Sequence, residues 1–185
     1  MSRMLIFCLL ILAASTTTLN AQGFQPPAEG KAVVYFVPLK KVVSFEYFHN
    51  DKYIGVFSGK NFMRYECDPG KQLLWASSEN KEFVEADLKA GGTYIIMVEN
   101  AFGVGRARVS LTPITTKNTE EFEKVKKLVL KQKPAVTSEE KIVEMNEKLQ
   151  EFIPEKLNMY KTEWRNKYPI ISITPDMAIP AESLK

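Results

Sequence analysis

The sequence predicts a mainly β protein: an antiparallel β-sandwich of about seven to eight strands, of the immunoglobulin or transthyretin type, followed by roughly two to three C-terminal helices. Between residues 31 and 115, short runs rich in β-branched and aromatic side chains alternate with turn residues every roughly 8 to 12 residues. Beyond residue 116 the composition changes, because all nine glycines lie before that point and apolar residues then recur at helical spacing. These observations place the sandwich at 31–115 and a helical segment at 116–168.

The first strands are the easiest to assign. Residues 31–38 are apolar on both faces, which indicates a strand that is covered on both sides. Asn50 and Asp51 then separate two further strand patterns. These residue types suit a tight hairpin because they tolerate left-handed backbone angles.

From residue 61 to residue 99 we expect a meander of antiparallel strands. Its turns are Pro69-Gly70, a polar turn at 79–81 and Gly91-Gly92, all built from residue types that favour chain reversal. A last strand at 106–112 alternates between apolar and polar residues. Long helical patterns are absent between these runs, which argues against a parallel α/β sheet.

Three helical stretches follow, each with a start signal. Asn118 with Glu121, and Thr137 with Glu140, have the spacing of capping boxes. Pro154 suits the start of a third helix. Their apolar residues form a stripe that we expect to pack on or beside the sandwich, since an exposed stripe would be a large apolar patch. The alternative is that the helices project and bind a partner or a second copy, which leaves the oligomeric state open.

The N-terminus has the pattern of a secretory signal peptide at 1–21. A basic start precedes an apolar run, and a small residue stands at the expected cleavage site between Ala21 and Gln22. A transmembrane helix needs about 20 consecutive apolar residues, so we expect no stable membrane anchor after processing. Cys8 follows the bulky Phe7, whereas a lipid-attachment cysteine needs a small residue before it. The pattern therefore predicts an exported, periplasmic or extracellular protein that is not a lipoprotein.

Two short segments flank the predicted fold. Residues 22–30 contain Pro26-Pro27 and suggest an extended leader. Residues 169–185 contain three prolines, which suggests one edge strand and a loose tail.

Charge and cysteine content limit the classes of partner. The net charge is +3 and the charges of both signs are interspersed, so nucleic acid is not an expected partner. After cleavage Cys67 would be the only cysteine, which excludes an internal disulfide. Cys67 shares a strand face with Met63 and Tyr65, so we expect a buried thiol rather than a reactive one.

Catalytic and metal sites have little support. His49 is the only histidine, which excludes a multi-histidine metal site, and we expect no cofactor. His49 could pair with Asp51 or with Cys67, but His49 and Asp51 lie in a turn where such residues are common. Glu85 and Asp87 share one strand face, as carboxylates do on any solvated sheet. A hydrolase with an unrecognised carboxylate or cysteine site is the alternative to a binding protein.

The better functional candidate is the loop expected at 99–105. Phe102 stands beside two glycines, and Arg106 and Arg108 follow. An apolar loop tip next to arginines is typical of an interaction edge. The alternative is that Phe102 folds back over the end of the sandwich. The predicted interaction loop is therefore Phe102, Arg106 and Arg108.

Several turn and strand motifs form a recognisable set. Residues 51–55, 62–71, 90–94 and 106–111 resemble the domain-of-unknown-function 2846 family. The resemblance implies a small exported bacterial β-sandwich, often a lipoprotein, with no established activity. The Tyr-Ile-Gly hairpin and the Pro-Gly-Lys turn are also similar to PEGA-type surface modules of bacterial envelopes. The family's lipid-attachment cysteine is missing here. Together these features predict a non-enzymatic binding or structural module of the cell envelope that contacts protein or glycan.

Overall fold

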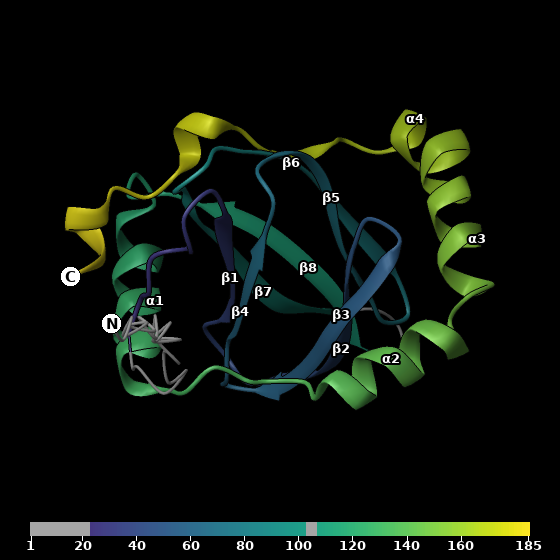
Figure 1. Ribbon diagram of the computed structural model, residues 1–185, viewed down its shortest axis with the longest axis horizontal. Helices are drawn as coiled ribbons and strands as arrows, with labels where there is room; N and C mark the ends of the chain where they lie inside the picture. The colour runs from purple at the N-terminus through teal and green to yellow at the C-terminus, as the bar shows by residue number, and fades with distance from the viewer. Residues whose placement is uncertain (1–22, 103–106) are drawn as a thin grey trace, which may run out of the picture.

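In the computed structural model, which describes residues 23–102 and 107–185, nine strands form two sheets that stack on each other (Figure 1). The strands are β1 (Ala32–Pro38), β2 (Val42–His49), β3 (Lys52–Gly59), β4 (Met63–Cys67), β5 (Gly70–Ser77), β6 (Lys81–Leu88), β7 (Thr93–Phe102), β8 (Ala107–Ile114) and β9 (Ile171–Ile173). One sheet has the order β4-β1-β7-β8 and the other the order β3-β2-β5-β6-β9. The chain is therefore mainly β and sandwich-like, as predicted.

Both sheets are mixed, whereas the sequence analysis expected antiparallel ones. β1 runs parallel to β7 and β6 runs parallel to β9, while the other pairs are antiparallel. The expected meander does not form, because the chain changes sheets twice within it. β4 lies in one sheet, β5 and β6 form a hairpin in the other, and β7 returns to the first. Turn residues predict that the chain reverses, but they do not specify which sheet the next strand joins.

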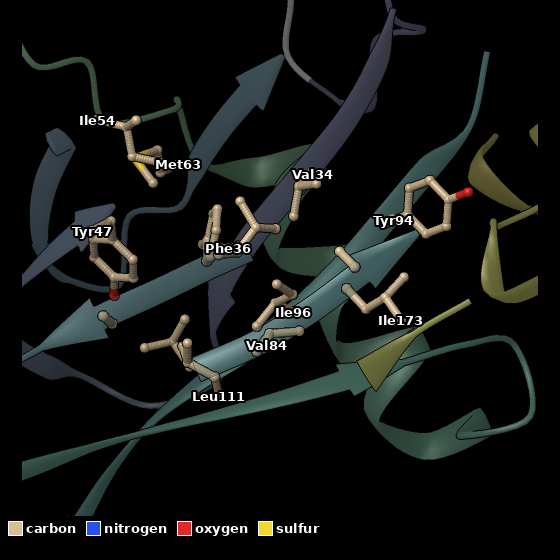
Figure 2. Packing of buried hydrophobic residues seen from close by; sticks show 14 of the residues in the cluster. Val34, Phe36, Tyr47, Ile54, Met63, Val84, Tyr94, Ile96, Leu111 and Ile173 are labelled. Carbon is tan, nitrogen blue, oxygen red and sulfur yellow. The ribbon is translucent and has the colours of Figure 1, made fainter. Parts of the chain in front are cut away.

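The main core lies between the two sheets and is built from their inward-facing side chains. Figure 2 shows side chains from both sheets meeting in this layer, among them Val34, Ile96 and Val84. Tyr47 is fully buried there and stacks on Phe57 with ring centroids 4.7 Å apart. Burial of this apolar area is the main stabilising contribution to the fold.

Helix α1 (Thr119–Lys131) covers the outer face of the four-stranded sheet. Its buried residues Phe122, Val125 and Val129 pack with outward-facing residues of β1 and β7. As a result β1 is buried along its whole length, on both faces. This confirms the expectation drawn from its uninterrupted apolar sequence.

The remaining helices cover the outer face of the five-stranded sheet, on the opposite side of the molecule (Figure 1). They are α2 (Glu139–Lys148), α3 (Phe152–Met159), the π-helical turn η1 (Tyr160–Trp164) and α4 (Arg165–Lys167). We call residues 139–167 the helical arm. The arm packs around Trp75, which is fully buried and stacks on Phe48 with ring centroids 3.8 Å apart. The helices thus pack on the sandwich, but they divide between its two outer faces.

The helix starts differ in detail from the expected capping boxes. Asn118 precedes α1, but its side chain accepts a hydrogen bond from the Thr115 N–H instead of capping the helix. Ser138, one residue beyond the expected Thr137, caps α2 by accepting a backbone N–H. Pro154 lies in the first turn of α3, where a missing N–H costs no helical hydrogen bond.

At two sheet edges, an asparagine side chain makes the backbone hydrogen bonds that a neighbouring strand would make. Asn146 of α2 accepts from the N–H of Tyr53 and donates to its carbonyl, at 2.9 and 3.1 Å. Asn80 makes the same pair of hydrogen bonds with Val109 of β8, both at 2.8 Å. Unpaired edge groups invite pairing with other chains, so these two asparagines close the edges that they contact.

The segment before α2 lies against β3 at Gly55. Thr137 Oγ1 accepts a hydrogen bond from the Val56 N–H at 3.1 Å. A Cβ atom at Gly55 would lie 2.8 Å from that oxygen, and the φ angle of Gly55 is +151°. Glycine is therefore required here both by the backbone conformation and by the close approach.

The two flanking segments are tied to the fold. In the leader, Phe24 packs edge-on against Tyr35 with ring centroids 4.8 Å apart. After β9, the chain forms the 3-10 turns η2 (Pro175–Met177) and η3 (Ala181–Leu184). Between them Ile179 is 5% exposed, and its N–H donates to the carbonyl of Thr93 in β7. The C-terminal segment thus contains the expected edge strand, but it is packed rather than loose, because apolar residues continue beyond the strand.

Candidate binding site

A groove of about 360 Å³ lies where the helical arm meets one edge of the sandwich. β6, β8, the arm and the connection from α4 to β9 form its walls. Its lining residues are Asn80, Glu82, Phe83, Arg108, Tyr160, Trp164, Arg165, Tyr168, Pro169, Ile170 and Ile171. Ligand pockets commonly measure about 300–1,000 Å³, so this groove is at the small end of that range.

The groove is open because β9 is short. It pairs only with residues 84–86 of β6, so the start of β6 has no neighbouring strand on that side. Tyr168 precedes Pro169 and has an extended backbone, which ends α4 and carries the chain across the opening toward β9. On the other side, the Asn80–Val109 hydrogen bonds hold β8 in place.

Aromatic rings form one wall of the groove. Phe83 and Tyr160 are 6% and 7% exposed, with ring centroids 4.4 Å apart. Trp164 meets the Phe83 ring edge-on at 5.9 Å and lies 5.0 Å from the ring of Tyr168, which is 46% exposed. The wall therefore runs without a break from the buried core of the arm to the solvent.

A carboxyl group and a guanidinium group lie on the sandwich side. Glu82 of β6 is half-buried, and burial raises its pKa above the ordinary value, an effect that the charge of Arg108 partly opposes. Arg108 of β8 is exposed. Within the described part of the chain, neither side chain makes a hydrogen bond or a close ion pair. Both retain free hydrogen-bonding capacity at the groove.

Glu85, three residues further along β6, differs from Glu82 because its carboxylate has hydrogen-bonding partners. It accepts hydrogen bonds from the Tyr160 hydroxyl at 2.7 Å and from Arg165 Nε at 2.8 Å. These bonds, with that of Tyr160 first, hold the pKa of Glu85 below its ordinary value. They attach η1 and α4 to the sheet. The same cluster borders a second, more open cleft of about 500 Å³, which is also lined by Lys71 and Asp87.

The predicted interaction loop is only partly present at the groove. Arg108 lines it. Phe102 is the last residue of β7 and belongs to the ladder with β8, so the strand continues through residues that were expected to form a loop. The side chain of Phe102, together with Arg106, lies outside the described residues.

The predicted signal peptide and its cleavage site, Ala21 and Gln22, also lie outside the described residues. In the part of the chain from Gly23 onward that the structure describes, no helix is long and apolar enough to span a membrane.

Among the described residues, neither catalytic pair considered for a hydrolase is formed. His49 Nε2 lies 2.8 Å from Gln72 Oε1 and its Nδ1 lies 2.8 Å from the Tyr65 hydroxyl oxygen, so both ring nitrogens have hydrogen-bonding partners. Asp51 lies in the two-residue hairpin loop between β2 and β3, as predicted. Cys67 is 6% exposed in the main core, and burial raises its pKa to about 11. The prediction of a buried thiol is confirmed.

The sequence analysis missed Glu82, Trp164 and Tyr168 as groove residues. Trp164 packs on Phe83, and it also lines the groove. A signal was present in the exposed segment from Tyr168 to Ile170, where an aromatic, a proline and an aliphatic residue follow one another. Exposed apolar segments of this kind mark contact sites.

No protein-family model matches this chain, and no curated protein matches it.

Proposed function

We propose that this chain is a non-enzymatic, exported binding module of the bacterial cell envelope, and that the groove is its contact site for protein or glycan. One observation carries the proposal: an aromatic wall ending in the exposed Tyr168 lines the same groove as Glu82 and Arg108, which have no close partners among the described residues. Sites that combine apolar and aromatic walls with a few polar groups are typical of ligand binding. Tyr, Trp and Arg are also the residues most enriched at binding hot spots.

The envelope location is supported by the N-terminal pattern and by the resemblance to the domain-of-unknown-function 2846 family and PEGA-type modules. The proposal includes the fold type: a sandwich of the immunoglobulin or transthyretin kind. Export predicts that the mature protein begins at Gln22, because the signal peptide is cut after Ala21. Mass spectrometry of the secreted or periplasmic protein checks this, and a mature protein that retains Met1 or Ser2 would contradict it.

Site-specific photo-crosslinking tests the groove. A photoreactive phenylalanine replaces Tyr168 in the full chain, and illumination is carried out in the native envelope. Leu130 on α1 provides a matched control position, because it is apolar and also 46% exposed. We expect a discrete adduct from position 168 that is absent from position 130. Equal labelling at the two positions, or no adduct at either, would contradict the proposal.

A hydrolase is the second candidate, and the environment of the Glu82 carboxyl group is the observation that favours it. Burial raises the pKa of this half-buried carboxyl group, which is the direction of shift that favours a general acid. The nearby Glu85 is held by Tyr160 and Arg165, so it is not free to act as a second carboxylate. Turnover of a substrate that is bound in the groove, abolished in Glu82→Gln, would move the assignment to the hydrolase.

A further inference from the structure

The groove presents ring surfaces that a ligand can cover. Tyr168 is 46% exposed, and Trp164 beside it is half-buried against Phe83. The faces of aromatic rings carry partial negative charge, so they favour ligand surfaces made of weakly positive C–H groups. A pyranose ring has such a face, with its C–H bonds on one side and its hydroxyl groups around the perimeter.

The polar groups are placed to serve hydroxyl groups. Glu82 offers acceptor oxygens and Arg108 offers several N–H donors, and no partner among the described residues takes up either side chain. A hydroxyl both donates and accepts, so adjacent hydroxyls of a sugar can satisfy both side chains at once. The charges of Glu82 and Arg108 offset each other, while Arg165 is already paired with Glu85. Among the described residues, the charges at the groove thus balance in two pairs, which gives no preference for an acidic ligand.

Peptide binding by strand addition is disfavoured at both edges that border the groove. At β8, the N–H and carbonyl of Val109 are occupied by Asn80. At β6, only the short stretch 81–83 lacks a neighbouring strand on the groove side, because residues 84–86 are already paired with β9. An extended peptide needs a continuous free edge, and an amphipathic helix needs a long apolar groove. A groove of about 360 Å³ suits a smaller ligand.

We propose that this groove binds a neutral saccharide, as about one or two sugar units at the end of a glycan. The sugar ring stacks on Trp164 and Tyr168, and its hydroxyl groups donate to Glu82 and accept from Arg108. This inference rests on the proposed function of the groove as a contact site and specifies the class of its ligand.

A glycan array tests the proposal with the full-length chain. The array carries oligosaccharides that end in neutral hexoses, N-acetylhexosamines or deoxyhexoses, and others that end in uronic or sialic acids. We expect binding to one or more neutral-ended glycans. Calorimetry with the best-bound array glycan is then expected to show about a tenfold or larger loss of affinity in Tyr168→Ala and in Arg108→Ala. Leu130→Ala, with the same exposed fraction as Tyr168, and Thr112→Ala, on the same strand as Arg108, serve as matched controls that keep the affinity of the parent chain.

Three results would overturn the saccharide assignment. These are the absence of binding to any array glycan, a preference for acidic ends, and affinities that are equal in the groove variants and the controls. If the chain binds no saccharide but photo-crosslinking at Tyr168 captures a protein, the proposed function stands and the saccharide inference fails. If neither experiment gives a groove-specific result, both fail. Circular dichroism of each variant confirms that a lost affinity reflects the site rather than unfolding.

Discussion

The two outer faces of the sandwich are covered in different ways. On the four-stranded sheet, α1 buries Phe122, Val125 and Val129, each 5% exposed or less. On the five-stranded sheet, the helical arm uses aromatic rings together with hydrogen-bonding groups such as Asn146 and Glu85. The first cover is a continuous apolar contact. The second ends in a groove where rings and charged groups remain accessible, so one cover contributes mainly stability and the other can also contribute a binding surface.

The largest expected effect is on the α1 side. Phe122→Ala removes a buried ring and is expected to lower the free energy of unfolding by about 3–5 kcal/mol. Phe152→Ala in the arm removes a half-buried ring and is expected to cost roughly half as much, in proportion to the apolar area lost. Denaturant unfolding measures both, with the exposed Leu130→Ala as the control, expected to change stability by less than about 0.5 kcal/mol. A larger loss of unfolding free energy from Phe152→Ala than from Phe122→Ala would contradict the conclusion that the α1 side contributes more to stability.

The next effect concerns the segment that leads into the arm. Gly55→Ala brings a Cβ atom into Thr137 Oγ1 and imposes a φ angle that alanine rarely adopts, with an expected cost of about 1–3 kcal/mol. In the double variant Gly55→Ala with Thr137→Ala the clash is removed but the backbone strain remains. Part of the loss should therefore be recovered, relative to the sum of the two single variants. Strict additivity of the unfolding free energies would show that the close approach at Gly55 does not matter.

The hydrogen bonds of Asn146 are expected to affect both the free energy of unfolding and the hydrogen exchange of the backbone that they contact. Asn146→Ala leaves the N–H and carbonyl of Tyr53 without their partner, with an expected cost of about 1–3 kcal/mol. Hydrogen exchange of the Tyr53 amide should become faster. Asn158→Ala is the matched control, since Asn158 is also in an arm helix but is exposed. If both substitutions affect exchange at Tyr53 equally, the edge contact contributes nothing specific.

The smallest expected effect concerns Glu82 and Glu85 on β6, whose pKa values are shifted in opposite directions. The folded-state pKa of Glu85 is lowered, so its contribution to stability is present above the unfolded pKa of about 4.3 and is lost as pH falls through the folded value. The folded-state pKa of Glu82 is raised, so its contribution is present below the unfolded pKa and is lost as pH rises through the folded value. At pH 7, Glu85→Gln should therefore cost up to about 1 kcal/mol, because the pair is partly exposed, and Glu82→Gln should be neutral or stabilising.

Unfolding measured from pH 7 down to acid checks both signs. The deficit of Glu85→Gln relative to the parent chain should shrink below about pH 4, since the parent carboxyl group then becomes protonated. A deficit that grows on acidification would contradict the role given to Glu85 in holding the arm.

Much of the fold could be predicted because its signals are local. The double-sided burial of β1 follows from its uninterrupted apolar run, and the hairpin loop at Asn50 follows from a residue that tolerates its φ angle of 50°. The parallel pairing of β1 with β7 and the two changes of sheet were not predicted. They depend on which buried faces fit together across the sandwich, and a turn such as Pro69-Gly70 carries no information about that choice.

The candidate site was only partly predictable for the same reason. Arg108 was identified because it follows Phe102 and two nearby glycines in the sequence. Glu82 and Tyr168 were not, because the groove arises only when the C-terminal segment returns to pair β9 with β6. Residues brought together by such a long-range contact share no local pattern. The exposed apolar segment at Tyr168 was the one local signal.

Hydroxyl-radical footprinting of the full chain, alone and mixed with isolated native envelope, tests most directly whether the groove is the contact site. Trp164 and Tyr168 report on the groove, and Leu130 reports on the exposed surface of α1. Mass spectrometry gives the oxidation rate of each side chain. We predict that the envelope slows oxidation of Trp164 and Tyr168 and leaves Leu130 unchanged. Protection at Leu130 with unchanged rates at Trp164 and Tyr168 would place the contact on the α1 face and contradict the account.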